Sequence, residues 1–345
     1  MAFAQIQRTF IYTIMKTIRL FLLTLGLMAM GFTVSAQEKA AETKKYDIVV
    51  ARDGSGDFRN IQDAIESIRA FKPGERTVVY IKKGVYKEKV TVHSWITNVD
   101  FIGEDKENTI ITYDDHANIN IPGTAMKMGT FRTHTVLVQG NDITFQNLTI
   151  ENNAEQKGQA VALHVEGDRV AFFNCNILGN QDTIYTGREQ TRNYFENCYI
   201  EGTTDYIFGP STAWFEACQL HCKRDSYITA ASTPEYVKFG YIFNNCKITA
   251  ADIVKKMYLG RPWRQYGMTL FMHCDMSSFM RPEGWHNWGK AENEQTARYY
   301  EFENTGEGAA IDKRVAWSKQ LTKKEAKEYT LENVMGDWNP LLLKK

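Results

Sequence analysis

One short phrase recurs along the chain and constrains the fold more than any other feature. It begins with phenylalanine and ends three residues later, with cysteine in five of its six copies and with leucine in the first. The copies are separated by stretches that contain Gly, Asn, Asp or Pro, and each lies in a segment rich in β-formers. The phenylalanines are Phe145, Phe172, Phe195, Phe215, Phe243 and Phe271, at intervals of 27, 23, 20, 28 and 28 residues.

A repeat of this length, built from short strands, is typical of a solenoid whose units bury their apolar faces against their neighbours. The unequal intervals favour a parallel β-helix, because loops of different length can leave each coil without disturbing the stack. A propeller would need longer and more regular units. With 43% apolar side chains in 345 residues, the chain can form one large all-β domain. The sequence therefore predicts an all-β, single-stranded parallel β-helix.

The cysteines follow the same repeat. Five of the six, all except Cys222, occupy equivalent positions in successive coils. We expect an interior ladder of small thiols rather than disulfides, although stacking could also bring two of them close enough to bridge. No CxxC pair with matching histidine spacing occurs. The case for a zinc site is therefore weak, and we expect no metal or other cofactor.

The ends of the repeat carry helical signals. Apolar residues at helical spacing predict a helix over 58–70 that caps the N-terminal end of the solenoid, and strands are expected at 77–81, 89–92, 99–102 and 109–112. Thr322 and Glu325 have the spacing of a capping box that begins a short C-terminal helix. No linker divides the chain, so residues 46–340 are expected to form one domain and to work as a monomer.

The N-terminal residues have the pattern of a secretory signal peptide. Lys16 and Arg19 precede an apolar run over 20–34, and the small residues Ser35 and Ala36 follow it. We expect a signal peptide over 1–36 with its start at Met15 or Met1, a linker over 37–45, and export to the periplasm or the medium. A membrane anchor is the alternative, but the run is short and no basic residue follows it directly. No membrane span is expected in the mature chain.

The balance of charge argues against one class of partner. Lys and Arg number 41, and so do Asp and Glu, which gives a formal net charge of zero. Proteins that bind nucleic acid usually carry a basic surface, so this balance does not support nucleic acid as a partner.

Two carboxylates have the spacing of successive coils. Asp182 and Asp205 are 23 residues apart, Gln159 lies 23 residues before Asp182, and Gln181 adjoins it. Residues one coil apart in a parallel sheet stack at about 4.8 Å, so these side chains are expected to form one column. Two carboxylates so close should titrate differently, which suits a nucleophile beside a proton donor. A pair of solvated turn aspartates explains the spacing equally well.

A third cluster, Leu259–Trp263, supplies a cation and an aromatic face that could act together with the carboxylates. The Arg261 guanidinium could pair with one carboxylate and keep it ionised. Trp263 offers an aromatic face for a sugar ring. As an isolated pentapeptide the segment could equally be a surface turn.

Together these clusters resemble the pectin methylesterase family, and the similarity extends over 46–340. Its motifs occur here in order, at residues 53–58, 80–86, 129–132, 159–163, 167–169, 181–183, 205–209 and 259–263. The resemblance implies a right-handed parallel β-helix with short terminal capping helices. It also implies hydrolysis of the methyl esters of homogalacturonan (pectin) without a cofactor.

The resemblance further implies a role for each residue of the clusters. Asp205 would be the nucleophile and Asp182 the acid and base. Gln181, with Gln159 nearby, would donate hydrogen bonds to the oxyanion, and Arg261 would orient Asp205. Trp263 would form a wall of the sugar cleft, and Thr130 would contact substrate at its edge.

Two positions depart from the family pattern. Tyr206 stands where phenylalanine is usual, and His164, expected to be structural, stands where arginine is common. Trp285 and Trp288 resemble a later tryptophan pair of the family and could belong to the core or to the cleft. These departures affect subsite preference rather than the reaction.

Other functions remain open on the sequence. One is a β-helical hydrolase or lyase that cuts the glycosidic bond of the same polymer. Others are an esterase or thioesterase acting on a different substrate, and a β-helix that only binds carbohydrate.

Overall fold

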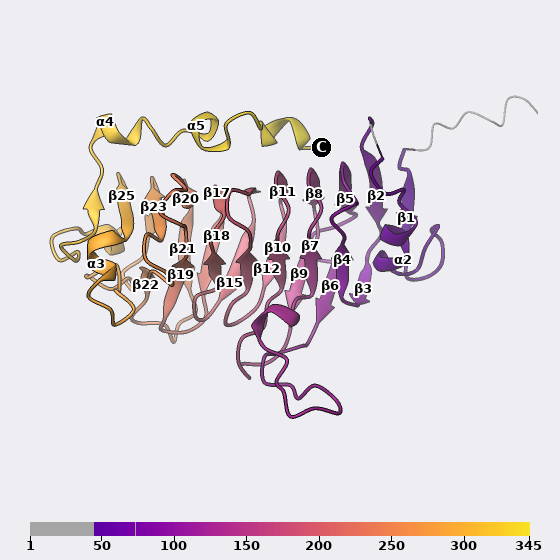
Figure 1. The fold of residues 1–345 in the computed structure, drawn as a ribbon, viewed down its shortest axis with the longest axis horizontal. Helices are drawn as coiled ribbons and strands as arrows, with labels where there is room; N and C mark the ends of the chain where they lie inside the picture. The colour runs from indigo at the N-terminus through magenta and orange to yellow at the C-terminus, as the bar shows by residue number, and fades with distance from the viewer. Residues whose placement is uncertain (1–44, 73) are drawn as a thin grey trace, which may run out of the picture. The chain divides into compact units, whose positions relative to one another are not determined.

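The computed structural model describes residues 45–72 and 74–345. The predicted signal peptide over 1–36, its start at Met15, and all but the last residue of the predicted linker over 37–45 lie outside these residues. In the described part, three parallel sheets wind around one core (Figure 1). We call the sheets 1, 2 and 3. The chain passes through the three sheets in turn in each coil, and each strand pairs with the strands one coil before and one coil after it. The predicted all-β parallel β-helix is confirmed.

The strands are short and are best given sheet by sheet. Sheet 1 has 11 strands: β1 (Ile48–Val50), β2 (Thr77–Ile81), β5 (Val99–Gly103), β8 (Ile143–Gln146), β11 (Val170–Phe173), β14 (Arg192–Glu196), β17 (Thr212–Glu216), β20 (Tyr241–Asn244), β23 (Met268–Met272), β25 (Arg298–Phe302) and β26 (Lys319–Gln320). Sheet 2 has eight: β3 (Gly84–Lys87), β6 (Thr109–Tyr113), β9 (Thr149–Asn152), β12 (Asn176–Leu178), β15 (Tyr199–Gly202), β18 (Gln219–Cys222), β21 (Lys247–Ala250) and β24 (Asp275–Met276). Sheet 3 has seven: β4 (Val90–Val92), β7 (Val136–Val138), β10 (Leu163–Val165), β13 (Ile184–Thr186), β16 (Ile207–Gly209), β19 (Tyr227–Ala231) and β22 (Tyr258–Gly260).

The repeated phenylalanines form a stack through the core of sheet 1. All six pair in register with their neighbours, and successive ring centroids lie 4.4 to 5.3 Å apart. Phe101 adds a seventh ring, stacked 4.9 Å from Phe145, that the repeat did not include. Offset stacking of buried rings adds to the burial of their area, so the repeat explains why the coils align.

A left-handed residue turns the chain from sheet 1 into sheet 2. Asn147, Asn174, Asn197 and Asn245 have φ between 50° and 55°, a conformation that asparagine tolerates better than most residues. The cysteines that follow the turn are buried and free, as is Cys222. Their Sγ atoms contact backbone carbonyl oxygens, as Cys175 does at 3.4 Å from Phe173. The expected thiol ladder is confirmed.

The helices differ in part from expectation. Helix α2 (Ile61–Glu66) is shorter than the predicted 58–70, because Phe58 bridges to Val50 and the helix ends at Ser67. It buries Ile61, Ala64 and Ile65 at the β1 end of the stack, consistent with a capping role. The remaining helices are α3 (Asn293–Thr296), α4 (Lys323–Ala326), α5 (Leu331–Met335) and the 3-10 turns η1 (Thr130–Arg132), η2 (Glu307–Ala309) and η3 (Pro340–Leu343).

The C-terminal segment lies along the stack rather than across its end. Thr322 and Glu325 form the predicted capping box of α4. Val334, Met335 and Trp338 then pack on apolar side chains of sheet 1, and the segment runs back along the coils (Figure 1). This placement covers the outer face of sheet 1 and leaves the outer face of sheet 3 available for a site.

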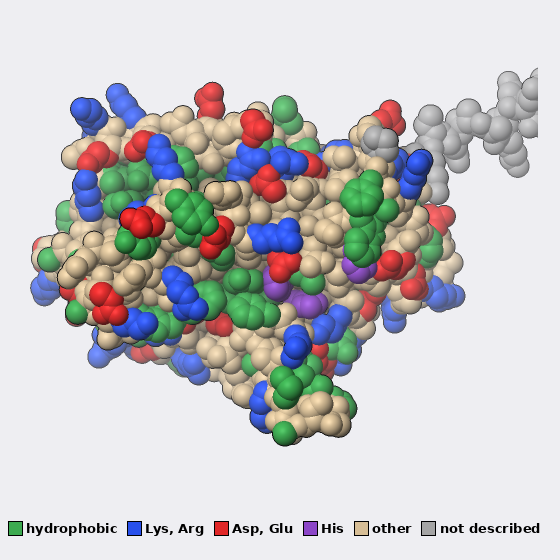
Figure 2. Space-filling model, in the orientation of Figure 1, with side chains coloured by type: hydrophobic (Ala, Val, Ile, Leu, Met, Phe, Trp, Pro, Cys, Tyr) green, Lys and Arg blue, Asp and Glu red, His purple; other side chains and the backbone are tan. Residues whose placement is uncertain are grey.

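Two surface observations bear on partners. On the face shown in Figure 2, basic and acidic side chains are interspersed rather than gathered by sign. Among the described residues, no helix is long and apolar enough to cross a membrane.

Candidate active site

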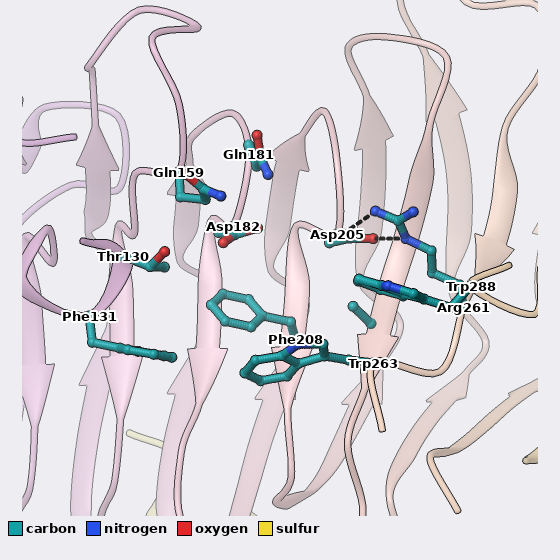
Figure 3. A pocket seen from close by; sticks show the side chains of 11 residues that line it. Thr130, Phe131, Gln159, Gln181, Asp182, Asp205, Phe208, Arg261, Trp263 and Trp288 are labelled. Atoms are coloured by element: carbon teal, nitrogen blue, oxygen red, sulfur yellow. Dashed lines mark hydrogen bonds and ion pairs between the residues drawn. The ribbon is translucent and has the colours of Figure 1, made fainter. Parts of the chain in front are cut away.

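A pocket on the outer face of sheet 3 brings together all seven residues singled out from the sequence. They are Thr130, Gln159, Gln181, Asp182, Asp205, Arg261 and Trp263, and the pocket also includes Phe131, Phe208, Ala230 and Trp288 (Figure 3). The turns between sheets 2 and 3 carry the two aspartates, and the segment after β22 carries Arg261. Residues distant in the sequence therefore meet because each coil returns to the same face.

The strand register explains how the carboxylates meet. Ile184 pairs with Ile207 in adjacent strands, so Asp182 and Asp205, two residues earlier, are also one coil apart. Both aspartates have left-handed backbone, with φ of 65° and 49°. Their N–H groups donate to the carbonyl oxygens of Thr204 at 3.1 Å and Tyr227 at 2.8 Å, which holds this strained conformation.

The predicted column is wrong for Gln159. Strand β10 pairs Leu163 with Ile184, a step of 21 residues, so Gln159 falls two positions short of the residue stacked on Asp182. The coil containing Gln159 is shorter than the next one, which constant spacing could not anticipate. Gln159 still reaches the pocket, and its amide projects beside Asp182 together with that of Gln181 (Figure 3). Neither side-chain amide has a hydrogen-bond partner within the described part of the chain, so both can donate to a ligand.

Asp205 is held by a two-point contact with Arg261. The Arg261 Nε donates to Oδ1 at 3.0 Å and Nη2 donates to Oδ2 at 2.7 Å (Figure 3). Burial raises the pKa of Asp205, while the hydrogen bonds and charge of Arg261 oppose that rise. Asp205 is 6% exposed, so this pairing is only weakly screened by water.

Asp182 has a different environment. The residue is 9% exposed, and its carboxyl has no hydrogen-bond partner among the residues that the structure describes. Burial and then the charge of Asp205 raise the pKa of Asp182 well above its usual value, against a smaller opposing effect of Arg261. The two carboxyls are therefore unequal: Asp182 tends to hold a proton, and Asp205 has a cation at contact distance.

Aromatic side chains that the sequence did not assign complete the walls. Phe208 points outward from β16 and lies 5.8 Å from the Trp263 ring, centroid to centroid. Strand alternation could have identified Phe208, because Ile207 faces the core. Phe131, beside Thr130 in η1, is 47% exposed and lines the opposite side (Figure 3).

The tryptophan pair divides between core and pocket. Trp285 is 1% exposed and donates from its indole nitrogen to Glu301 Oε1 at 3.2 Å. Trp288 lines the pocket. Only the tertiary structure separates these roles, because the two residues are three apart in an irregular loop.

The two departures from the family pattern, His164 and Tyr206, lie outside the pocket. His164 packs against Tyr185 and lies 3.2 Å from Glu166, measured from Nε2 to Oε1. Tyr206 is fully buried, and its hydroxyl lies 3.6 Å from Cys222 Sγ, so the additional oxygen faces the core. Within residues 45–72 and 74–345, no group of three or more His, Cys, Asp or Glu side chains could hold a metal ion.

Comparisons with known proteins agree with this arrangement. The sequence model of the family described as pectinesterase matches residues 47–337. Pectinesterase 31 of Arabidopsis thaliana is 41% identical over 286 residues, which cover 80% of this chain and 88% of that protein. The chain spans about half the length of several other curated relatives, whose names join pectinesterase to pectinesterase inhibitor.

Solved structures match over most of their length. Pectin methylesterase from carrot has a TM-score of 0.81 and 32% identity, with 88% of this chain and 98% of that chain covered. A pectin methylesterase in complex with a hexasaccharide has a TM-score of 0.74 and 31% identity, with 86% and 98% covered.

Proposed function

The chain belongs to the pectinesterase family of carboxylic ester hydrolases, and from that premise we propose that it hydrolyses the methyl esters of polygalacturonate to pectate and methanol. The observation that carries this proposal is the inequality of the two carboxyls. Asp205 is paired with Arg261, whereas Asp182 is buried beside it without a hydrogen-bond partner among the described residues.

In the first step, an Asp205 oxygen attacks the ester carbonyl carbon. The carbonyl oxygen becomes an oxyanion, which accepts hydrogen bonds from the amides of Gln181 and Gln159. The tetrahedral intermediate expels the methoxy group, which takes the proton of Asp182 and leaves as methanol. The galacturonyl group is then bound to Asp205 as an anhydride.

In the second step, the carboxylate left on Asp182 takes a proton from water as that water attacks the anhydride carbonyl. The bond to Asp205 breaks and frees the Asp205 carboxylate and galacturonic acid, which releases its remaining proton to the solvent and becomes galacturonate. Asp182 is protonated again, so the enzyme returns to its starting state. The raised pKa of Asp182 supports this role, because the group must hold a proton before methanol leaves.

Substrate binding is assigned to the walls of the pocket. Trp263 and Phe208 offer aromatic faces to the pyranose rings, and Thr130 lies at the edge with a hydroxyl for hydrogen bonding. We further propose that the protein is exported and acts as a monomer. Size-exclusion chromatography with light scattering tests the oligomeric state.

The deciding experiment measures methanol and chain length together after incubation with highly methylated pectin. We expect methanol without shortening of the polymer. Chain cleavage without methanol would establish the glycosidic hydrolase or lyase instead. Asp205→Ala should abolish methanol release and retain the far-ultraviolet circular dichroism of the β-helix, because the stacked interior supplies the stability. Near-native turnover by that variant would remove Asp205 from the nucleophile role.

A further inference from the structure

The Arg261 guanidinium lies between two aromatic rings. Its Cζ atom is 3.8 Å from the centroid of Tyr227 and 3.8 Å from the centroid of Trp288. Two rings that close to one planar group must lie on its opposite faces. The edge of the same guanidinium donates both hydrogen bonds to Asp205. Both faces of the guanidinium and its Nε–Nη2 edge are therefore occupied.

Tyr227 reaches this position through the strand register. Ile207 pairs with Thr229 in adjacent strands, so Tyr227 lies one coil beyond Asp205, in the column that begins with Asp182. Tyr258 follows in the next coil, and the two tyrosine rings stack with centroids 5.2 Å apart and planes within 8°. The Tyr227 ring is therefore supported on the side away from Arg261.

We propose that Tyr227 is a positioning residue whose ring, opposed by that of Trp288, holds Arg261 in its two-point contact with Asp205. Attraction between a cation and two ring faces is strongest where water is excluded, and Arg261 is largely covered here. The rings also limit the rotamers open to a long side chain, which reduces the entropy lost in making both hydrogen bonds. The proposal rests on the role of Asp205 given above.

Tyr227 can be tested more cleanly than Trp288. Trp288 lines the pocket and can touch substrate, whereas Tyr227 is not among the lining residues.

The other titratable groups near this cluster are Asp182, Arg281, Tyr299 and His286, whose ring is 5.4 Å from that of Tyr227. Burial, then the charges of Arg261 and Arg281, lower the pKa of His286, so it is neutral near pH 7.

The test compares Tyr227→Leu, which keeps apolar bulk but removes the ring, with Tyr227→Phe, which keeps the ring. Tyr80→Leu is the matched control, because Tyr80 stacks on Tyr46 at 4.2 Å in the first coils of sheet 1. Two quantities are measured for each protein. One is the pKa of Asp205, from ¹³C titration of labelled aspartate carboxyls with the signal assigned by Asp205→Asn. The other is kcat and KM for methanol release as a function of pH.

We expect Tyr227→Leu to lower kcat about tenfold with KM within about twofold, because two-sided stacking on Arg261 is lost. The pKa of Asp205 and the acid limb of kcat should both rise by about half a unit, since a looser Arg261 opposes protonation less. Tyr227→Phe and Tyr80→Leu should match the unmodified protein.

An unchanged Asp205 titration in Tyr227→Leu would overturn the proposal, and so would a Tyr227→Phe variant that behaves like Tyr227→Leu. If Tyr227→Leu does not fold, Tyr227→Met removes the ring with the same expected results. Absence of methanol release by the unmodified protein would refute the proposed function instead. The carboxyl titration needs no turnover and would still decide the role of Tyr227.

Discussion

Replacing Arg261 by lysine tests the difference between the two carboxyls, Asp205 paired with a cation and Asp182 unpaired, on which the proposed mechanism depends. Lysine keeps the positive charge but cannot reproduce two parallel hydrogen bonds to one carboxylate. The bonds lost or weakened are those at 3.0 and 2.7 Å to Asp205. A hydrogen bond to a charged group contributes about 1.5–3 kcal/mol. Because Arg261 orients the attacking carboxylate, we expect that free energy to appear in kcat, as a loss of about 10- to 160-fold.

The same substitution has a defined effect on pH dependence. Burial raises the pKa of Asp205 and Arg261 opposes that rise, so a weaker partner lets the pKa rise further. The nucleophile must be ionised, so activity falls as pH drops through this pKa. The acid limb of the kcat profile should therefore move to higher pH by about one to two units.

The assay is methanol release from methylated oligogalacturonate across a pH series. Arg76→Lys is the matched control, because Arg76 also pairs with a buried aspartate, its Nε donating to Asp100 Oδ1 at 2.7 Å, but in the first coils of sheet 1. That control should lose stability without moving the acid limb. If Arg261→Lys keeps the kcat and acid limb of the control, Arg261 does not govern Asp205, and the proposed division of roles fails.

Other substitutions give equally specific results. Gln181→Ala should lower kcat about 100- to 1,000-fold in the methanol assay, with a smaller change in KM, because one oxyanion donor is lost; an equal loss through KM alone would make Gln181 a ground-state contact. Asp182→Asn should stop turnover yet raise Tm at pH 7 by about 2 °C, or about 1 kcal/mol, as removal of a poorly solvated acid often does. Folding raises the pKa of Asp182. The contribution of this group to stability is therefore full below its unfolded pKa of about 3.9 and is lost as pH rises through its folded pKa. The Tm gain, measured by calorimetry, should therefore shrink towards pH 4, and a gain independent of pH would contradict the raised pKa.

Sequence reasoning succeeded where the structure repeats locally. The Phe–Cys phrase predicted the stacked coils, because the same residue types satisfy the same core position in each coil. The interval of 23 residues between Asp182 and Asp205 equals the interval between Cys175 and Cys198. This equality predicted that the two aspartates lie one coil apart, as the strand register shows. It failed for Gln159, because one shorter coil displaces the register by two positions.

The sequence by itself determined the β-helix and the pairing of two carboxylates, since both follow from the length and pattern of single coils. The coil pattern left open which carboxylate receives the arginine, because Arg261 is 56 residues beyond Asp205 and its direction depends on the coils between. The family resemblance implied Asp205, and the tertiary structure shows that contact. Only the tertiary structure decided that Tyr227 and Trp288 enclose that guanidinium while Trp285 enters the core. Such choices depend on how side chains from different coils fill one space, which no pattern within a single coil specifies.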